Sequence, residues 1–103
     1  MVIKETDYVV IPGCFVSVLR LKGNTLLVLS IINGFSQGLE NQLFEGSNEY
    51  LADWCGCNEQ EIEEILNYLE GENHIIRESF IWRNERHTGY AVNYINNEGG
   101  SEL

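Results

Sequence analysis

The residues of this 103-residue chain that most readily bind a metal ion are three cysteines and two histidines. Cys55 and Cys57 are one residue apart, whereas paired cysteines in the common zinc motifs are separated by two or more. Cys14, His74 and His87 are scattered along the rest of the sequence. We therefore expect no metal site. An odd number of cysteines fits reduced thiols in a cytoplasm better than a disulfide framework.

The sequence has no recognisable catalytic motif. It contains neither a nucleophile elbow nor a glycine-rich phosphate-binding loop, and no pair of carboxylates is associated with a predicted pocket. We therefore expect a protein that is not an enzyme and that uses no cofactor.

The most distinctive stretch is CNEQEIEEILNYLEGENHII, residues 57–76, which contains six glutamates and neither lysine nor arginine. Its apolar residues recur at helical spacing and predict one narrow buried face, made of Ile62, Ile65, Leu66 and Leu69. The opposite face is then polar and carries Gln60, Glu63, Glu64, Asn67 and Tyr68. Amides and carboxylates in this pattern can form hydrogen bonds, but the carboxylates repel a polyanion. The glutamates near the helix start also suit the positive end of the helix dipole, which accounts for them without any ligand.

Charge is unevenly distributed along the chain, whose net charge is −10. Residues 23–76 hold ten acidic residues and no lysine or arginine. Residues 77–95 hold Arg77, Arg83 and Arg86 against two glutamates. Such a field steers the protein away from phosphate unless one surface reverses it locally.

Length and hydropathy favour one intracellular domain. The chain is long enough to bury a core without metals or disulfides. It has no apolar run of 18 residues, and its N-terminus lacks the hydrophobic region of a secretory signal. We expect no membrane span and a cytoplasmic location.

The periodicity predicts a mainly α-helical fold with a small β-hairpin. The expected helices are 13–21, 24–36, 47–55 and 58–71, and the expected hairpin is 74–95 with its turn at 84–89. Candidate N-caps are Asn24, Ser47 and Asn58, and Gly56 suits the stop between the last two helices. Trp54, Trp82, Tyr90 and Tyr94 fall on faces that we expect to be buried. Residues 1–95 would form the domain, and 96–103 a flexible tail that resembles the start of a linker to a further region.

The helix expected at 24–36 is apolar over an arc of about 200°, about twice the usual width. Two explanations remain open. The helix is either central in the domain or covered by a second copy of the chain in a homodimer. In a homodimer, Val28, Leu29 and Ile32 would lie at the interface.

The order of elements is that of a winged helix-turn-helix. Two stretches, IPGCFVSVLRLKGNTLLVLSIINGFSQ and FEGSNEYLADWCGCNEQEIEEILNYLEGENHI, resemble the N-terminal domain of phage replisome organisers and plasmid-type replication initiators. The resemblance covers about residues 8–94 and implies binding of double-stranded DNA in replication or its regulation. It implies that Gln60, Glu63, Glu64, Asn67 and Tyr68 face the groove, and that the wing arginines Arg83 and Arg86 contact the backbone. His87, beside Arg86 in the expected turn, is a further candidate for contact with a polyanion.

The acidic helix departs from that pattern because base-reading side chains need phosphate-binding cations beside them, and this helix supplies none. We therefore expect weak DNA binding by this domain alone. The alternative is a winged helix that binds another protein, or dimerises, without touching DNA. Tyr68 favours this alternative, because an exposed aromatic among acids is often a partner contact.

Overall fold

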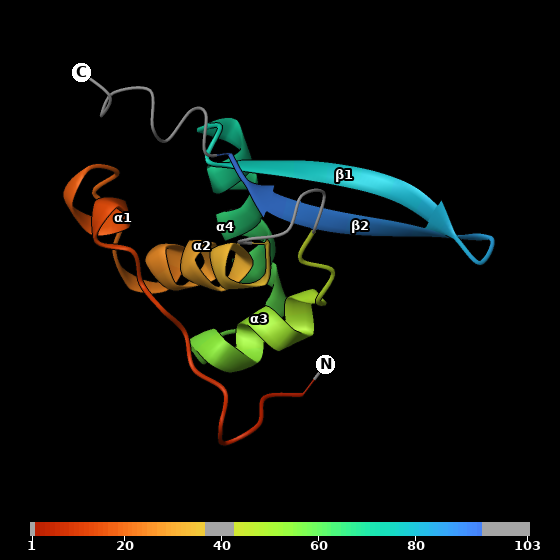
Figure 1. The fold of residues 1–103 in the computed structure, drawn as a ribbon, viewed down its shortest axis with the longest axis horizontal. Coiled ribbons are helices and arrows are strands. Elements are labelled where there is room, and N and C mark those ends of the chain that lie inside the picture. Colours follow the sequence, from red (N-terminus) through yellow and green to blue (C-terminus); the bar gives the residue numbers. More distant parts are fainter. Residues whose placement is uncertain (1, 37–42, 94–103) are drawn as a thin grey trace.

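The computed structural model describes residues 2–36 and 43–93, in which four helices precede a two-stranded antiparallel hairpin (Figure 1). The elements are α1 (Gly13–Ser17), α2 (Gly23–Ser36), α3 (Asn48–Cys55), α4 (Glu59–Gly71), β1 (Ile75–Trp82) and β2 (Glu85–Val92). This order confirms the expected mainly helical fold and is consistent with a winged helix. No helix within the described ranges is long and apolar enough to cross a bilayer. Tyr94 and the expected tail, residues 96–103, lie outside these ranges.

Helix α2 lies at the centre of the domain. It contacts α3, α4 and β2, and Val28, Leu29 and Ile32 are fully buried within one chain. Another side of the same helix buries Ile31 and faces the N-terminal segment around Val9, which packs against the core. The wide apolar arc is therefore covered from within the chain. The expectation that Val28, Leu29 and Ile32 form a dimer interface is wrong for this structure.

The caps of α3 and α4 form as the sequence predicts. The Ser47 hydroxyl accepts a hydrogen bond from the Tyr50 N–H at 3.1 Å, and the Asn58 side-chain oxygen accepts one from the Glu61 N–H at 2.8 Å. Between the helices, Gly56 adopts the left-handed conformation with φ of 68°, which glycine tolerates without strain. These local signals fix the turn between α3 and α4.

The first helix is shorter than expected. It ends at Ser17 rather than residue 21, and Arg20 takes a left-handed backbone conformation with φ of 59°. The Leu21 N–H then donates to the Phe15 carbonyl at 3.1 Å, and both side chains are buried. Burial of Leu21 outweighs continuation of the helix. Helix α2 also starts one residue early, so Asn24 lies in its first turn and is not its N-cap.

The hairpin turn lies at Arg83 and Asn84, not at 84–89. Both residues have positive φ, as a two-residue type I′ turn requires. In the resulting register Ile75 pairs with Val92 and Arg77 with Tyr90, and this face packs on the core. Trp82 therefore lies on the other face and is 54% exposed, contrary to expectation. Trp54 is only half-buried, whereas Tyr90 is buried as expected.

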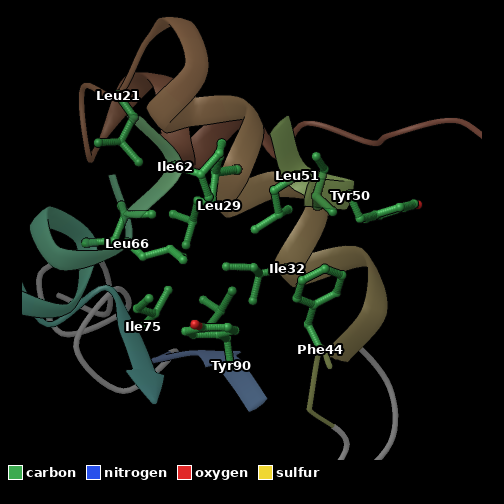
Figure 2. Close-up of a cluster of buried hydrophobic side chains, with 14 of the residues drawn as sticks. Leu21, Leu29, Ile32, Phe44, Tyr50, Leu51, Ile62, Leu66, Ile75 and Tyr90 are labelled. Atoms are coloured by element: carbon green, nitrogen blue, oxygen red, sulfur yellow. The ribbon is translucent and has the colours of Figure 1, made fainter. Parts of the chain in front are cut away.

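Phe44, which precedes α3 in the sequence, pairs with Tyr90 of β2 through an isolated antiparallel bridge. Its backbone N–H donates to Tyr90 at 2.7 Å and its carbonyl accepts from Tyr90 at 2.9 Å. The Phe44 side chain is fully buried, and Figure 2 shows it at one end of a core cluster that extends past Ile32 towards Leu21. The approach of this segment requires Gly89, because a β-carbon there would lie 2.7 Å from the Leu43 side chain. The helices and the hairpin expected from periodicity do not include this segment.

Substitution of Leu66 tests how this core is packed. It is fully buried in the cluster that also contains Leu51 and Ile32. Leu66→Ala should lower the free energy of unfolding by about 2–5 kcal/mol, because the truncation leaves a cavity. Asn67→Ala, one residue away on the exposed side, should change it by less than about 0.5 kcal/mol. Urea denaturation measures both. Equal effects would show that α4 is rotated relative to this structure.

Candidate nucleic-acid interface

Helix α4 presents one polar face to solvent. Ile62, Leu66 and Leu69 are fully buried on the side that packs on the domain. The opposite side carries four exposed residues that the sequence assigned to it, Gln60, Glu64, Asn67 and Tyr68. The Gln60 amide donates to the Glu64 carboxylate at 3.4 Å, a long hydrogen bond. The structure therefore brings these four candidates together on the second helix of the helix-turn-helix.

Glu63 does not belong to this exposed face, which corrects the expectation from spacing. Its carboxylate lies 3.5 Å from the Arg77 guanidinium and accepts a hydrogen bond from the Asn48 amide at 3.1 Å. Glu70, two turns further along α4, lies 3.7 Å from the same guanidinium. Two of the six glutamates therefore connect α4 to β1 and to the start of α3.

Arg77 is positioned by a second contact. Its guanidinium carbon lies 5.3 Å from the centre of the Tyr90 ring, to which Arg77 is paired across the hairpin. Burial raises the pKa of the Tyr90 phenol, and the positive charge of Arg77 opposes that rise. With two carboxylates and a ring around it, Arg77 is not free to bind phosphate. The sequence contained a signal for these ion pairs. Glu63 and Glu70 share one face of α4, and β1, which carries Arg77, is the next element in the chain.

The exposed cations of the wing lie at its tip, which projects away from the helices in Figure 1. Arg83 is in the turn, with its guanidinium 4.3 Å from the centre of the Trp82 ring, and Arg86 is exposed on β2. Glu85 lies between them in sequence and reduces the local positive charge. Arg20 and Lys22 lie between α1 and α2, at the other end of the molecule from this tip (Figure 1). They cannot reinforce it at short range.

His87 is a strand residue and not the exposed loop histidine that the sequence suggested. It pairs with Phe80 across the hairpin, and their rings stack at 5.6 Å between centres. The Trp82 ring meets His87 edge-on at 5.9 Å. Its Nε2 atom is buried and has no hydrogen-bond partner among the described residues. The ring is therefore part of an aromatic cluster on the outer face of the hairpin.

The two cysteines next to the helix-helix turn both have raised pKa values. Burial, with a smaller contribution from Cys57, raises the pKa of Cys55 to about 11. Burial and the nearby Glu61 raise the pKa of Cys57 as well. Thiolates are the form that binds metals, so the raised pKa values weaken both residues as ligands. In the part of the chain that the structure describes, no group of three or more histidine, cysteine or acidic residues is arranged to hold a metal ion.

Because Arg77 forms two ion pairs, its substitution should destabilise the protein in a salt-dependent way. Arg77→Gln removes two partly exposed ion pairs and the contact with Tyr90. It should lower the free energy of unfolding by about 1–2 kcal/mol. The loss should shrink at about 1 M NaCl, where charges are screened. Urea denaturation at low and high salt measures it. Arg86→Gln is the control and should have little effect, and an equal loss from both would refute the role of Arg77.

A comparison with protein families supports the helix-turn-helix geometry. A family model described as a helix-turn-helix domain matches residues 19–75, more than half of the chain. The match covers α2, α3 and α4 and reaches the start of β1. Searches among curated proteins and solved structures gave no match. On the extent of the family match and the arrangement of α3 and α4, the chain belongs to the helix-turn-helix domain family.

Proposed function

We propose that this domain binds double-stranded DNA with the exposed face of α4 in the major groove and the wing tip on the phosphate backbone. The observation that carries the proposal is the separation of the helix surface into two parts. Glu63 and Glu70 are turned towards Arg77, while Gln60, Glu64 and Asn67 remain on the exposed face. In helix-turn-helix proteins the second helix of the motif enters the groove, and here that helix is α4.

The exposed side chains suit hydrogen bonding to base edges. Gln60 and Asn67 lie two turns apart on α4, and their amides match the donor and acceptor atoms of adenine. The Glu64 carboxylate can accept a hydrogen bond from the amino group of cytosine. Tyr68 is 52% exposed on the same face and would contact sugar or a base edge. The proposal assigns base contacts to these residues and phosphate contacts to Arg83 and Arg86.

The electrostatic balance argues for weak binding by the isolated domain. Arg83 and Arg86 have no ion-pair partner among the described residues, so each can neutralise a phosphate. Glu59, Glu61 and Glu64 are exposed on or beside the groove-facing surface and oppose them. The Debye length at physiological salt is ~8 Å, so neighbouring charges are only partly screened. We expect non-specific affinity near the weak end of the usual range, a Kd around 10⁻⁴ M.

The resemblance to phage replisome organisers and plasmid-type initiators supports a place in replication initiation or its regulation. Specific binding would then need either dimerisation or a further region of the protein. A homodimer would have to use a surface other than Val28, Leu29 and Ile32, which are buried.

A second candidate function is recognition of another protein. The exposed Tyr68 on α4 favours it, as do the exposed Ile81 and Trp82 on the wing.

Removing the wing cations should weaken binding to random duplex and lower its salt dependence. Asparagine suits the left-handed backbone at position 83, so Arg83→Asn/Arg86→Gln keeps the turn and deletes two charges. The slope of log K against log salt should fall in magnitude by about 2, because each lost phosphate contact removes about 0.9. Titration of a labelled duplex at several salt concentrations measures the slope.

The control for this titration is Arg20→Asn/Lys22→Gln, which deletes the same charge at the far end of the molecule (Figure 1). It should leave most of the slope intact. Equal effects of the two variants would mean that net charge alone governs binding. No measurable binding of the unmodified domain at low salt would favour the protein-directed alternative.

The acidic face gives an independent prediction. Glu64→Gln removes the charge at the centre of the exposed face and keeps the shape of the side chain. Affinity for random duplex should rise several-fold at low salt and little at high salt. Glu5→Gln, in the exposed N-terminal segment, is the matched control. An unchanged affinity for Glu64→Gln would place the DNA away from this face.

A further inference from the structure

A pocket lies between the N-terminal segment, α2 and α3, away from the exposed face of α4. Its volume is about 350 Å³. Its lining comes from the segment Asp7–Val10, from α2 between Ser30 and Phe35, and from Tyr50 and Trp54 of α3. Figure 1 shows the N-terminal segment passing α3 on its way to α1, and Figure 2 shows the Tyr50 hydroxyl pointing away from the core cluster.

Three residues that line this pocket carry buried polar atoms without partners. They are the Ser30 hydroxyl, the Asn33 side-chain oxygen and the Trp54 indole N–H. None of these atoms has a hydrogen-bond partner in the described part of the chain, and the side chains of Ser30 and Asn33 are almost completely buried. Burial of an unpartnered polar group is unfavourable, and native proteins contain few such groups. The three atoms belong to residues that form the wall of one pocket, and a ligand that displaces part of this wall would supply the missing partners.

The size and walls of the pocket indicate what kind of molecule fits. A water molecule takes about 30 Å³ of liquid volume, so one ordered water would leave most of this space unfilled. Known small-molecule sites start near 300 Å³ and combine aromatic walls with a few polar groups. Here Tyr50 and Trp54 meet edge-to-face at 6.5 Å, and Tyr50 and Phe35 at 6.1 Å. The site therefore suits a ligand of one or two aromatic rings.

The charges around the pocket disfavour an anionic ligand. No lysine or arginine is among the lining residues that the structure describes, and Asp7 contributes a carboxylate at the N-terminal side. The Asn33 oxygen can only accept a hydrogen bond and the Trp54 N–H can only donate one, while the Ser30 hydroxyl can do both. The complementary molecule carries a donor and an acceptor of its own and no negative charge.

Access is possible from the N-terminal segment. Its hydrogen bonds are local, with the Lys4 N–H donating to the Asp7 carboxylate at 2.8 Å and the Asp7 N–H to the Lys4 carbonyl at 2.9 Å. Tyr8 and Val10 are exposed. A small outward shift of this wall would open the buried polar atoms to a ligand without breaking a helix.

We propose that this pocket binds a small uncharged aromatic molecule that bears a hydrogen-bond donor and acceptor on one edge. Asn33 and Trp54 are the two directional contacts, Ser30 is the adaptable one, and Tyr50 and Phe35 form the walls. This site is independent of the proposed DNA-binding surface.

The test uses nicotinamide and uracil as probes, with nicotinate as the anionic counterpart of nicotinamide. Two-dimensional NMR follows the indole N–H resonance of Trp54, and that of Trp82 in the wing serves as the internal control. The Trp54 signal should shift and saturate for at least one uncharged probe with a Kd on the order of 1 mM, as fits a fragment of this size. Nicotinate should bind at least about ten times more weakly than nicotinamide.

Two variants separate binding from folding. Ser30→Ala, followed at the Trp54 indole N–H, and Trp54→Phe, followed at the backbone amide of Asn33, should each weaken binding about threefold to tenfold, the value of one hydrogen bond, whereas Trp82→Phe should not. Ser30→Ala should leave the thermal midpoint unchanged or raise it, because the hydroxyl has no partner to lose. The proposal is overturned if no probe shifts Trp54 at about 10 mM, ten times the expected Kd, or if nicotinate binds as well as nicotinamide. A lower midpoint for Ser30→Ala with unchanged binding would also overturn it, since the hydroxyl would then be satisfied by ordered water.

Discussion

The rest of the structure depends on the burial of α2 on more than one side. Val28, Leu29 and Ile32 pack towards α3, α4 and β2, while Ile31 lies under the N-terminal segment. Because side chains in such a core interdigitate closely, each neighbour has little freedom to rotate about its own axis. The rotation of α4 is therefore set by the core, and with it the choice of residues that face solvent. The packing of the apolar core therefore determines which polar residues of α4 lie on the surface.

The ion pairs of Arg77 are a consequence of that rotation. Once Leu66 and its neighbours point inward, Glu63 and Glu70 face β1, where Arg77 stands over the Tyr90 ring. The acidic helix is then less unusual than its sequence suggests. Part of its charge joins helix to hairpin, and part suits the positive end of the helix dipole. What remains on the exposed face is one carboxylate, two amides and a tyrosine, a surface that can form hydrogen bonds but attracts phosphate poorly.

The fold was predictable because its signals are local. Ser47 and Asn58 cap their helices as their types suggest, and Gly56 permits the left-handed turn between them. The errors have a common cause. Helix α1 ends early, at Ser17, and Arg20 turns left-handed so that Leu21 reaches the core. The hairpin turns at Arg83 and Asn84, neither of which is glycine. In both places a long-range requirement overrides local preference. No periodicity in one segment can reveal such a requirement.

The sequence by itself determined the order of elements, the buried stripe of α4 and four of the five residues assigned to the opposite face of that helix, all but Glu63. Helical spacing is a property of the chain alone, so it survives whatever the helix packs against. The tertiary structure alone decided which charges are available. It turned Arg77 inward, placed His87 in an aromatic cluster and gathered Ser30, Asn33 and Trp54 around one pocket. The physical reason is that pairing and burial depend on distances between elements, and sequence spacing fixes distances only within an element.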